Sequence, residues 1–216
     1  MKCIVTAGPT YEELDEVRRL TNFSTGTLGT ELANFLAARG HEVELFRGHY
    51  STCQLEPVTR TQVFTTTADL RRRLQKVKNT DAVFHAAAVS DFAFGRIWSR
   101  APNGKLRPIR SPKISTRLGP VLAELVATPK IISELRSWFP NALLAGWKYE
   151  LEGNRAQAIA RGERQLIACN TDICVVNGRA YGAGFGLVTG RNECRHLRDK
   201  KSLFDALQQL VTSRTS

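Results

Sequence analysis

Apolar residues along this chain fall into short runs that alternate with stretches of helical periodicity. The runs at residues 2–7, 41–46, 62–66, 81–87, 142–149, 172–177 and 187–189 predict strands. Helices are expected at 25–38, 68–77, 129–138, 155–168 and 201–211. In the first helix Leu28, Leu32 and Phe35 form one apolar face. This alternation predicts an α/β fold of the Rossmann-like three-layer type, with a mainly parallel sheet and helices on both faces.

Two polar stretches interrupt this pattern. Residues 8–24 are interpreted as a long loop before the first helix, whose N-cap is expected at Ser24 or Thr25. Residues 92–118 are interpreted as a basic loop or flap, followed by a strand or edge hairpin at 121–127. Because the sequence shows neither an internal repeat nor a linker composition, a single domain over 1–216 is predicted.

The formal net charge is +11, and between residues 92 and 123 the chain carries seven basic and no acidic residues. Such a balance favours polyanionic partners, and a solvated basic loop is the alternative interpretation. No apolar run is long enough for a membrane span and no signal-peptide pattern opens the sequence, so we expect a cytoplasmic protein without a membrane partner. The five cysteines are scattered and are expected to be reduced thiols.

Four predicted strands end in loops with candidate ligand-binding residues, namely 8–10, 87–91, 146–148 and 177–178. Parallel sheets bind ligands beyond the carboxyl ends of their strands, so these loops should meet. The first loop leads into a helix start, where unpaired backbone N–H groups attract anions. We therefore expect a nucleotide and phosphate site at this edge.

The absence of common motifs argues against several enzyme classes. No GxGxxG joins a strand to a helix, no GxxxxGK[ST] occurs, and no GxSxG elbow is present. An NADP-binding reductase stays open as an alternative because Arg47 follows the second strand, where a 2′-phosphate could lie. A nucleic-acid binder is suggested by charge alone and is not expected, since the basic residues gather at the sheet edge.

Longer motifs match one family in order. The segment RRLTNFSTGTLG around Asn22 follows TAGPT and precedes AAAVSDF and Pro112-Lys113-Ile114. Together they resemble the phosphopantothenoylcysteine synthetase family over almost the whole chain. The resemblance implies a ligase of coenzyme A biosynthesis that joins 4′-phosphopantothenate to L-cysteine through an acyl-nucleotide intermediate made from CTP or ATP.

Residue roles come from this resemblance. It implies that Asn22 binds the intermediate and that Lys113 neutralises charge at the reacting groups. Substrate phosphate binding is expected at Ser24, Thr25 and Gly26. Nucleotide binding is expected at Gly8, Ala87, Ala88, Asp91, Trp147 and Lys148. Mg²⁺ is expected to bridge the triphosphate, with Asp91 as a candidate metal ligand, and no flavin is expected.

The resemblance also implies a homodimer and a hand-off of the product to a separate decarboxylase, because a flavin-dependent decarboxylase half is not expected in this chain. Two segments depart from the family pattern. Residues 146–151 read GWKYEL where the family has GFAAET, and two family lysines fall near Gln165 and Cys169, with Arg164 adjacent. A divergent nucleotide-binding paralogue without ligase activity is therefore a second hypothesis.

Overall fold

A mixed sheet forms the centre of the protein, whose computed structural model describes residues 1–56 and 60–213. Its eight strands follow the order β13-β12-β11-β10-β6-β1-β4-β5. They are β1 (Lys2–Ala7), β4 (Glu42–Gly48), β5 (Arg60–Phe64), β6 (Ala82–His85), β10 (Leu143–Tyr149), β11 (Ile173–Asn177), β12 (Phe185–Gly190) and β13 (Glu193–Leu197). The pairs from β5 to β11 are parallel and the last two pairs are antiparallel. The predicted fold class is thus confirmed.

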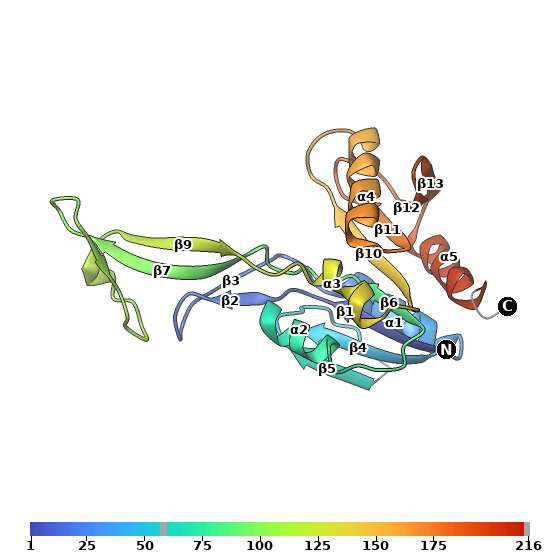
Figure 1. Cartoon of the computed structure of the whole chain (residues 1–216), viewed down its shortest axis with the longest axis horizontal. Coiled ribbons are helices and arrows are strands. Elements are labelled where there is room, and N and C mark those ends of the chain that lie inside the picture. The colour runs from blue at the N-terminus through green and yellow to red at the C-terminus, as the bar shows by residue number, and fades with distance from the viewer. Residues whose placement is uncertain (57–59, 214–216) are drawn as a thin grey trace.

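Helices cover both faces of this sheet (Figure 1). They are α1 (Thr27–Ala38), α2 (Thr67–Leu74), α3 (Ile131–Trp138), α4 (Arg155–Cys169) and α5 (Lys200–Thr212). Alternate residues of each strand serve opposite faces. Val5 packs with α1 and α5, whereas Ile4 packs with α2 and α3. Helix α4 lies on the second face, where Ala158 packs on Val176 of β11.

The stretch at 8–24 is not one long loop. It holds an antiparallel hairpin of β2 (Tyr11–Glu13) and β3 (Arg19–Thr21), in which Tyr11 lies opposite Thr21. The first helix is capped by Gly26, with no side-chain cap, rather than by Ser24 or Thr25. The hairpin escaped prediction because its strands are short and mostly polar, so they show no clear apolar alternation.

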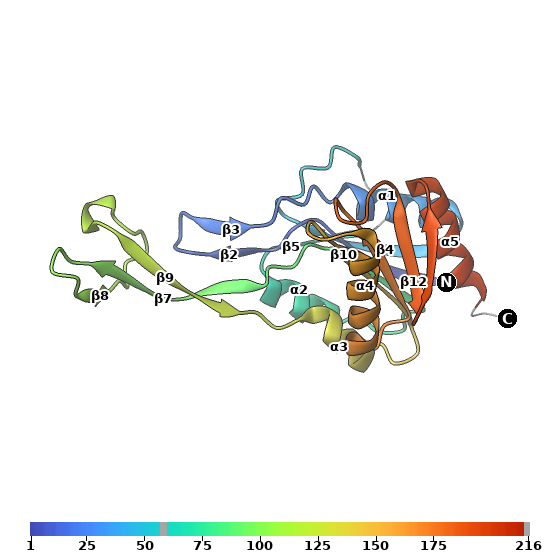
Figure 2. The same cartoon turned by 90° about the horizontal axis from the view of Figure 1, so that it is seen from above.

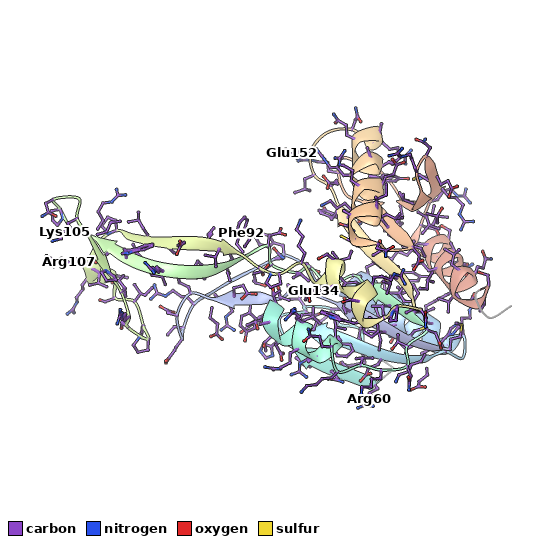
Figure 3. All side chains as sticks on the ribbon, in the orientation of Figure 1. Arg60, Phe92, Lys105, Arg107, Glu134 and Glu152 are labelled. Atoms are coloured by element: carbon purple, nitrogen blue, oxygen red, sulfur yellow. The ribbon has the colours of Figure 1, made fainter. Side chains whose placement is uncertain are left out.

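The basic stretch at 92–118 is likewise more ordered than a loop. It contributes β7 (Phe92–Arg100), β8 (Leu106–Pro108) and the 3₁₀ turn Thr116–Leu118 to a small sheet that β9 (Val121–Ala127) completes. This arm projects away from the main sheet, with Lys105 and Arg107 far out and Phe92 nearer its base (Figures 1 and 3). Hairpin β2–β3 extends on the same side (Figure 2).

Candidate functional site

The carboxyl ends of β1 and β6 are joined by backbone hydrogen bonds. Thr10 N–H donates to the Ala88 carbonyl at 3.1 Å, and Ala88 N–H donates to the Gly8 carbonyl at 3.0 Å. On the neighbouring strands, Glu150 N–H donates to the Asn177 carbonyl at 2.8 Å. The structure therefore brings the predicted loops to one edge of the sheet.

Asn22 reaches this edge from the end of β3. Its Nδ2 donates to the Ala88 carbonyl oxygen at 3.1 Å, and the side chain is exposed. Its Oδ1 accepts no hydrogen bond from the part of the chain that the structure describes, so the amide keeps an acceptor and a second donor hydrogen for a ligand. The contact joins two motifs that lie 66 residues apart in the sequence.

The start of α1 is built by close backbone contact. Gly26 has a φ of 77°, and a Cβ there would collide with Ser51 Oγ and lie 3.1 Å from the Gly8 Cα. Ser51 Oγ donates to the Thr25 carbonyl at 2.7 Å, which fixes the turn. Because no side chain caps this helix end beyond a 3.3 Å contact from Thr27 N–H to Thr25 Oγ1, its first amides remain available to an anion.

A pocket of about 410 Å³, here called the basic pocket, opens beside this edge between α3 and α4. Four cationic side chains and one carboxylate line it: Lys130, Lys148, Arg161, Arg164 and Asp91. This excess of positive charge favours an anionic ligand. The pocket thus contains two of the predicted nucleotide-binding residues, Asp91 and Lys148.

Glu150 moderates the charge of the pocket. Its carboxylate lies 2.6 Å from Arg161 Nη1 and 3.6 Å from Lys148 Nζ, and its side chain is 14% exposed. Arg161 Nη1 also donates to the Glu152 carbonyl at 2.7 Å. These contacts hold Arg161 and Lys148 in place, while no ion pair with Lys130 or Arg164 is formed within the described residues.

Trp147 does not line the basic pocket with Lys148. Successive residues of a strand point to opposite faces. Trp147 accordingly packs with Leu143 and Ala145 on the α1 and α5 face, and its indole Nε1 is buried without a partner among the described residues. The two residues predicted to bind nucleotide together are separated by the sheet.

Lys113 lies far from Asn22 within one chain. Its neighbours are held at the tip of hairpin β2–β3, where Ile114 N–H donates to Asp15 Oδ2 at 3.1 Å and Glu16 N–H donates to the Pro112 carbonyl at 3.0 Å. Asn22 follows the other end of this hairpin, which at about 3.3 Å per strand residue places it more than about 10 Å away. The Lys113 side chain is exposed.

Asp15 is the anchor of the Lys113 loop. The hydrogen bond from the Ile114 backbone, with those from Val17 and Arg18, lowers the pKa of Asp15 to about 2. Because the folded pKa lies below its ordinary value, the anchor is complete above about pH 4 and is lost as the pH falls through 2. It is therefore fully charged near neutral pH.

We expect Asp15→Ala to release the Lys113 loop. Without the carboxylate, the Ile114 amide loses its acceptor, and its hydrogen exchange should speed up by about 10-fold or more. Exchange measured by mass spectrometry on peptides spanning 112–118 tests this. The control is Glu13→Ala in the same hairpin, whose exposed side chain makes no such bond; equal exchange in both variants would contradict the anchor.

His85 is a site residue that the sequence did not reveal. It is 6% exposed, lines the basic pocket, and lies beside Thr6 on the next strand, with Nδ1 2.9 Å from Thr6 Oγ1. Burial lowers the pKa of His85 to about 4, so the ring is neutral near pH 7. Its position directly before the AAAVSDF motif was the available signal.

The hydrogen bonds of Thr6 fix the tautomer of His85. Ala87 N–H donates to Thr6 Oγ1 at 3.1 Å, and Nδ1 is the one acceptor within reach of the Thr6 hydroxyl hydrogen in the described chain. Placing the proton on Nδ1 would leave that buried hydroxyl unpaired, at a cost of roughly 1–3 kcal/mol. We therefore assign the ring proton to Nε2.

Other predicted features have clear places. Arg47 was the residue that kept the NADP-binding reductase open as an alternative. Its Nη2 donates to the Cys53 carbonyl at 2.5 Å, so the guanidinium is engaged by the backbone of a nearby loop. All five cysteines are free, and burial raises the pKa of Cys3 and of Cys174 to about 12.

Within residues 1–56 and 60–213, no cluster of three His, Cys, Asp or Glu side chains could hold a metal ion. None of the helices there has the length and apolar character that crossing a membrane requires.

Comparisons with known proteins identify the family of this chain. The family described as the DNA/pantothenate metabolism flavoprotein C-terminal domain matches residues 1–210. The coenzyme A biosynthesis bifunctional protein CoaBC of Thermococcus kodakarensis is 31% identical over 184 residues, which are 84% of this chain and 42% of that protein. The chain thus spans less than half the length of this curated relative.

Solved structures share the architecture. The DNA/pantothenate metabolism flavoprotein from Streptococcus pneumoniae has a TM-score of 0.82 and 25% identity, with 99% of both chains covered. A Cab2 variant in complex with phosphopantothenate-cysteine has a TM-score of 0.71 and 18% identity, covering 99% of this chain and 88% of that one. At this identity the second likeness shows the fold alone.

Proposed function

This chain belongs to the DNA/pantothenate metabolism flavoprotein C-terminal domain family, and on that premise we propose that it joins 4′-phosphopantothenate to L-cysteine in coenzyme A biosynthesis. In the first step a carboxylate oxygen attacks the α-phosphorus of a nucleoside triphosphate, and pyrophosphate leaves. In the second step the cysteine amine attacks the acyl carbon, the nucleoside monophosphate leaves, and the amine gives up a proton. Neither step needs a protein nucleophile.

The contact between Asn22 and Ala88 carries this proposal. It places a neutral amide between the uncapped start of α1 and the strand exit that borders the basic pocket. Such chemistry asks a protein mainly to align reactants and to stabilise developing charge. An amide that both donates and accepts can hold an acyl phosphate without repelling it.

The substrates divide between two regions in this proposal. The phosphate of phosphopantothenate is assigned to Ser24, Thr25 and Gly26 at the open end of α1. The nucleotide is assigned to the basic pocket, which Asp91 and Lys148 help to line, and to the backbone of Gly8, Ala87 and Ala88. Trp147 is left out of the nucleotide site because it packs on the other face of the sheet.

The basic pocket offers one exposed carboxylate that could bind Mg²⁺. Mg²⁺ in nucleotide sites is commonly bound by one or two carboxylates together with phosphate oxygens and water. Asp91 is the exposed carboxylate that lines the pocket, so we propose it as the protein ligand. The ion would neutralise charge on the triphosphate. We also propose that CTP or ATP is the co-substrate and that the reaction uses no flavin.

The arm supports the proposal of a homodimer. Its strands and 3₁₀ turn expose many apolar side chains, including Phe92, Leu106, Leu118, Leu125 and Val126. A sheet this narrow needs a covering surface to be stable, and a second copy of the arm would supply one. In that dimer Lys113 would reach the site of the partner subunit. We also propose that the product passes to a separate decarboxylase.

A direct assay tests the ligase. Purified protein is incubated with phosphopantothenate, cysteine, Mg²⁺ and CTP or ATP in turn, and pyrophosphate is measured. We expect release that depends on phosphopantothenate with at least one triphosphate. Failure with both would refute the ligase, and nucleotide binding without pyrophosphate would instead support the divergent paralogue, whose motivation is the altered 146–151 and 164–169 segments.

A further inference from the structure

The basic pocket has a charged rim and an apolar interior. Lys130 and Arg164 at its rim are exposed, and Lys148 is 39% exposed. Deeper residues belong to the core: Ile131 is 1% exposed, and Val89 and Ile132 pack against the buried cluster under α2 and α3. Polyphosphate suits such a rim, whereas a flat ring suits the interior.

His85 supplies a polar group to this interior. Its Nδ1 is engaged by Thr6, and no group of residues 1–56 or 60–213 hydrogen-bonds to Nε2. Some polar atoms of the described residues are fully enclosed and lack a hydrogen-bond partner, for example Trp147 Nε1 and both ring nitrogens of His41. His85 Nε2 is not one of them, so it is not fully enclosed. The remaining ring nitrogen of His85 therefore keeps contact with the space of the pocket that the side chain lines.

We propose that the Nε2–H of His85 donates a hydrogen bond to the nucleobase of the bound triphosphate and so holds the base in the basic pocket. The inference rests on the proposed function. The class of ligand is a heterocycle that presents a ring acceptor, either a carbonyl oxygen or an unprotonated ring nitrogen. Val89 and Ile132 flank the ring, and the phosphates lie among the rim cations.

Chemical matching favours the base over a phosphate as the partner of His85. A neutral imidazole brings no positive charge, whereas Lys130, Lys148 and Arg164 bring it at the rim. A buried donor rejects a ring that offers no acceptor, because its hydrogen would stay unpaired. Thr6 is a positioning residue, since its hydroxyl keeps the proton on Nε2 through Nδ1.

The test compares a nucleotide with a ligand that has phosphates and no base. Binding of CTP, of ATP and of inorganic tripolyphosphate is measured by titration calorimetry on the intact protein. We expect His85→Leu to weaken the preferred nucleotide by about 10- to 100-fold and to leave tripolyphosphate unchanged. His85→Gln, which keeps an N–H donor, should bind the nucleotide within about 3-fold of the unmodified protein. Lys148→Ala should weaken both ligands together.

The outcomes separate the inference from the proposed function. Nucleotide binding that His85→Leu leaves intact, or an equal loss of tripolyphosphate, overturns the role of His85 while the ligase stands. No nucleotide binding by the unmodified protein overturns the ligase and this inference with it.

A spectroscopic measurement covers the case in which His85→Leu fails to fold. The unmodified protein is labelled with ¹⁵N in its imidazole rings, and the nitrogen signals are measured by NMR. Only four histidines contribute signals. For His85 we expect a proton on Nε2 and a shift of that nitrogen when nucleotide is added. Thr6→Ser should keep this tautomer and Thr6→Val should weaken it. An Nδ1–H tautomer, or an Nε2 signal that does not respond to nucleotide, contradicts the proposal.

Discussion

Asn22→Asp is expected to lower kcat by about 100- to 1,000-fold while phosphopantothenate still binds. The new carboxylate would face the Ala88 carbonyl, to which Asn22 now donates at 3.1 Å, and would also repel an anionic acyl phosphate. Because α1 and its open amides are untouched, substrate binding should change only a few-fold. Pyrophosphate release gives the rate, and mass spectrometry shows whether the acyl-nucleotide is lost or accumulates.

Asn22→Ala is the matched control for charge. It removes the hydrogen bond without adding an anion, so its defect should be smaller than that of Asn22→Asp. The side chain is exposed, and both variants should melt near the unmodified protein. Turnover in Asn22→Asp at the unmodified rate would refute the role given to this amide.

Lys113→Gln should slow the ligase reaction by about 100-fold or more without a loss of folding stability, because an exposed loop lysine contributes little to the core. The hairpin holds Lys113 away from Asn22 of the same chain. In the proposed dimer the two residues meet across subunits. A mixture of the two inactive variants, Asn22→Asp and Lys113→Gln, should then recover activity.

The expected recovery follows from simple counting. Half of the randomly mixed dimers carry one chain of each variant, and one of their two sites has both native residues, so about a quarter of the unmodified activity returns. Refolding the two variants together allows the exchange, and each variant refolded alone is the control. No recovery, although mixed dimers form, would show that Lys113 serves its own chain.

Much of the fold was predictable because buried parallel strands and amphipathic helices leave strong periodic signals. Strand β1 was predicted with its observed bounds, and α4 ends one residue from its prediction. In the arm, β9 was expected as a strand or edge hairpin and has the expected bounds, but β7 and β8 were missed. The reason is that β7 mixes aromatic residues with arginines and a glycine, and a bulge lies between Phe94 and Ile97. Such strands lack the clean alternation that one buried face produces.

The site was predictable in part, for physical reasons. The sequence predicted that the loops near Gly8 and Ala88 meet, because parallel strands end at the same edge of a sheet. The structure joins them through a parallel bridge between Pro9 and Ala88. Strand alternation could have separated Trp147 from Lys148, since neighbours in a strand cannot share a face. His85 needed the structure, because its place beside Thr6 depends on the register of β1 against β6.

The burial of the cysteine side chains has a consequence for redox chemistry. The proposed substrate and product both carry free thiols, and a mixed disulfide with the protein would form only if an accessible protein thiolate attacked the oxidised, disulfide form of such a thiol. Cys3 and Cys174 hold their protons to a pKa of about 12, and burial also raises the pKa of Cys169 in the wall of the basic pocket. Mixed disulfides between the protein and its own substrate are therefore suppressed at these positions, so thiol chemistry is left to the small molecules.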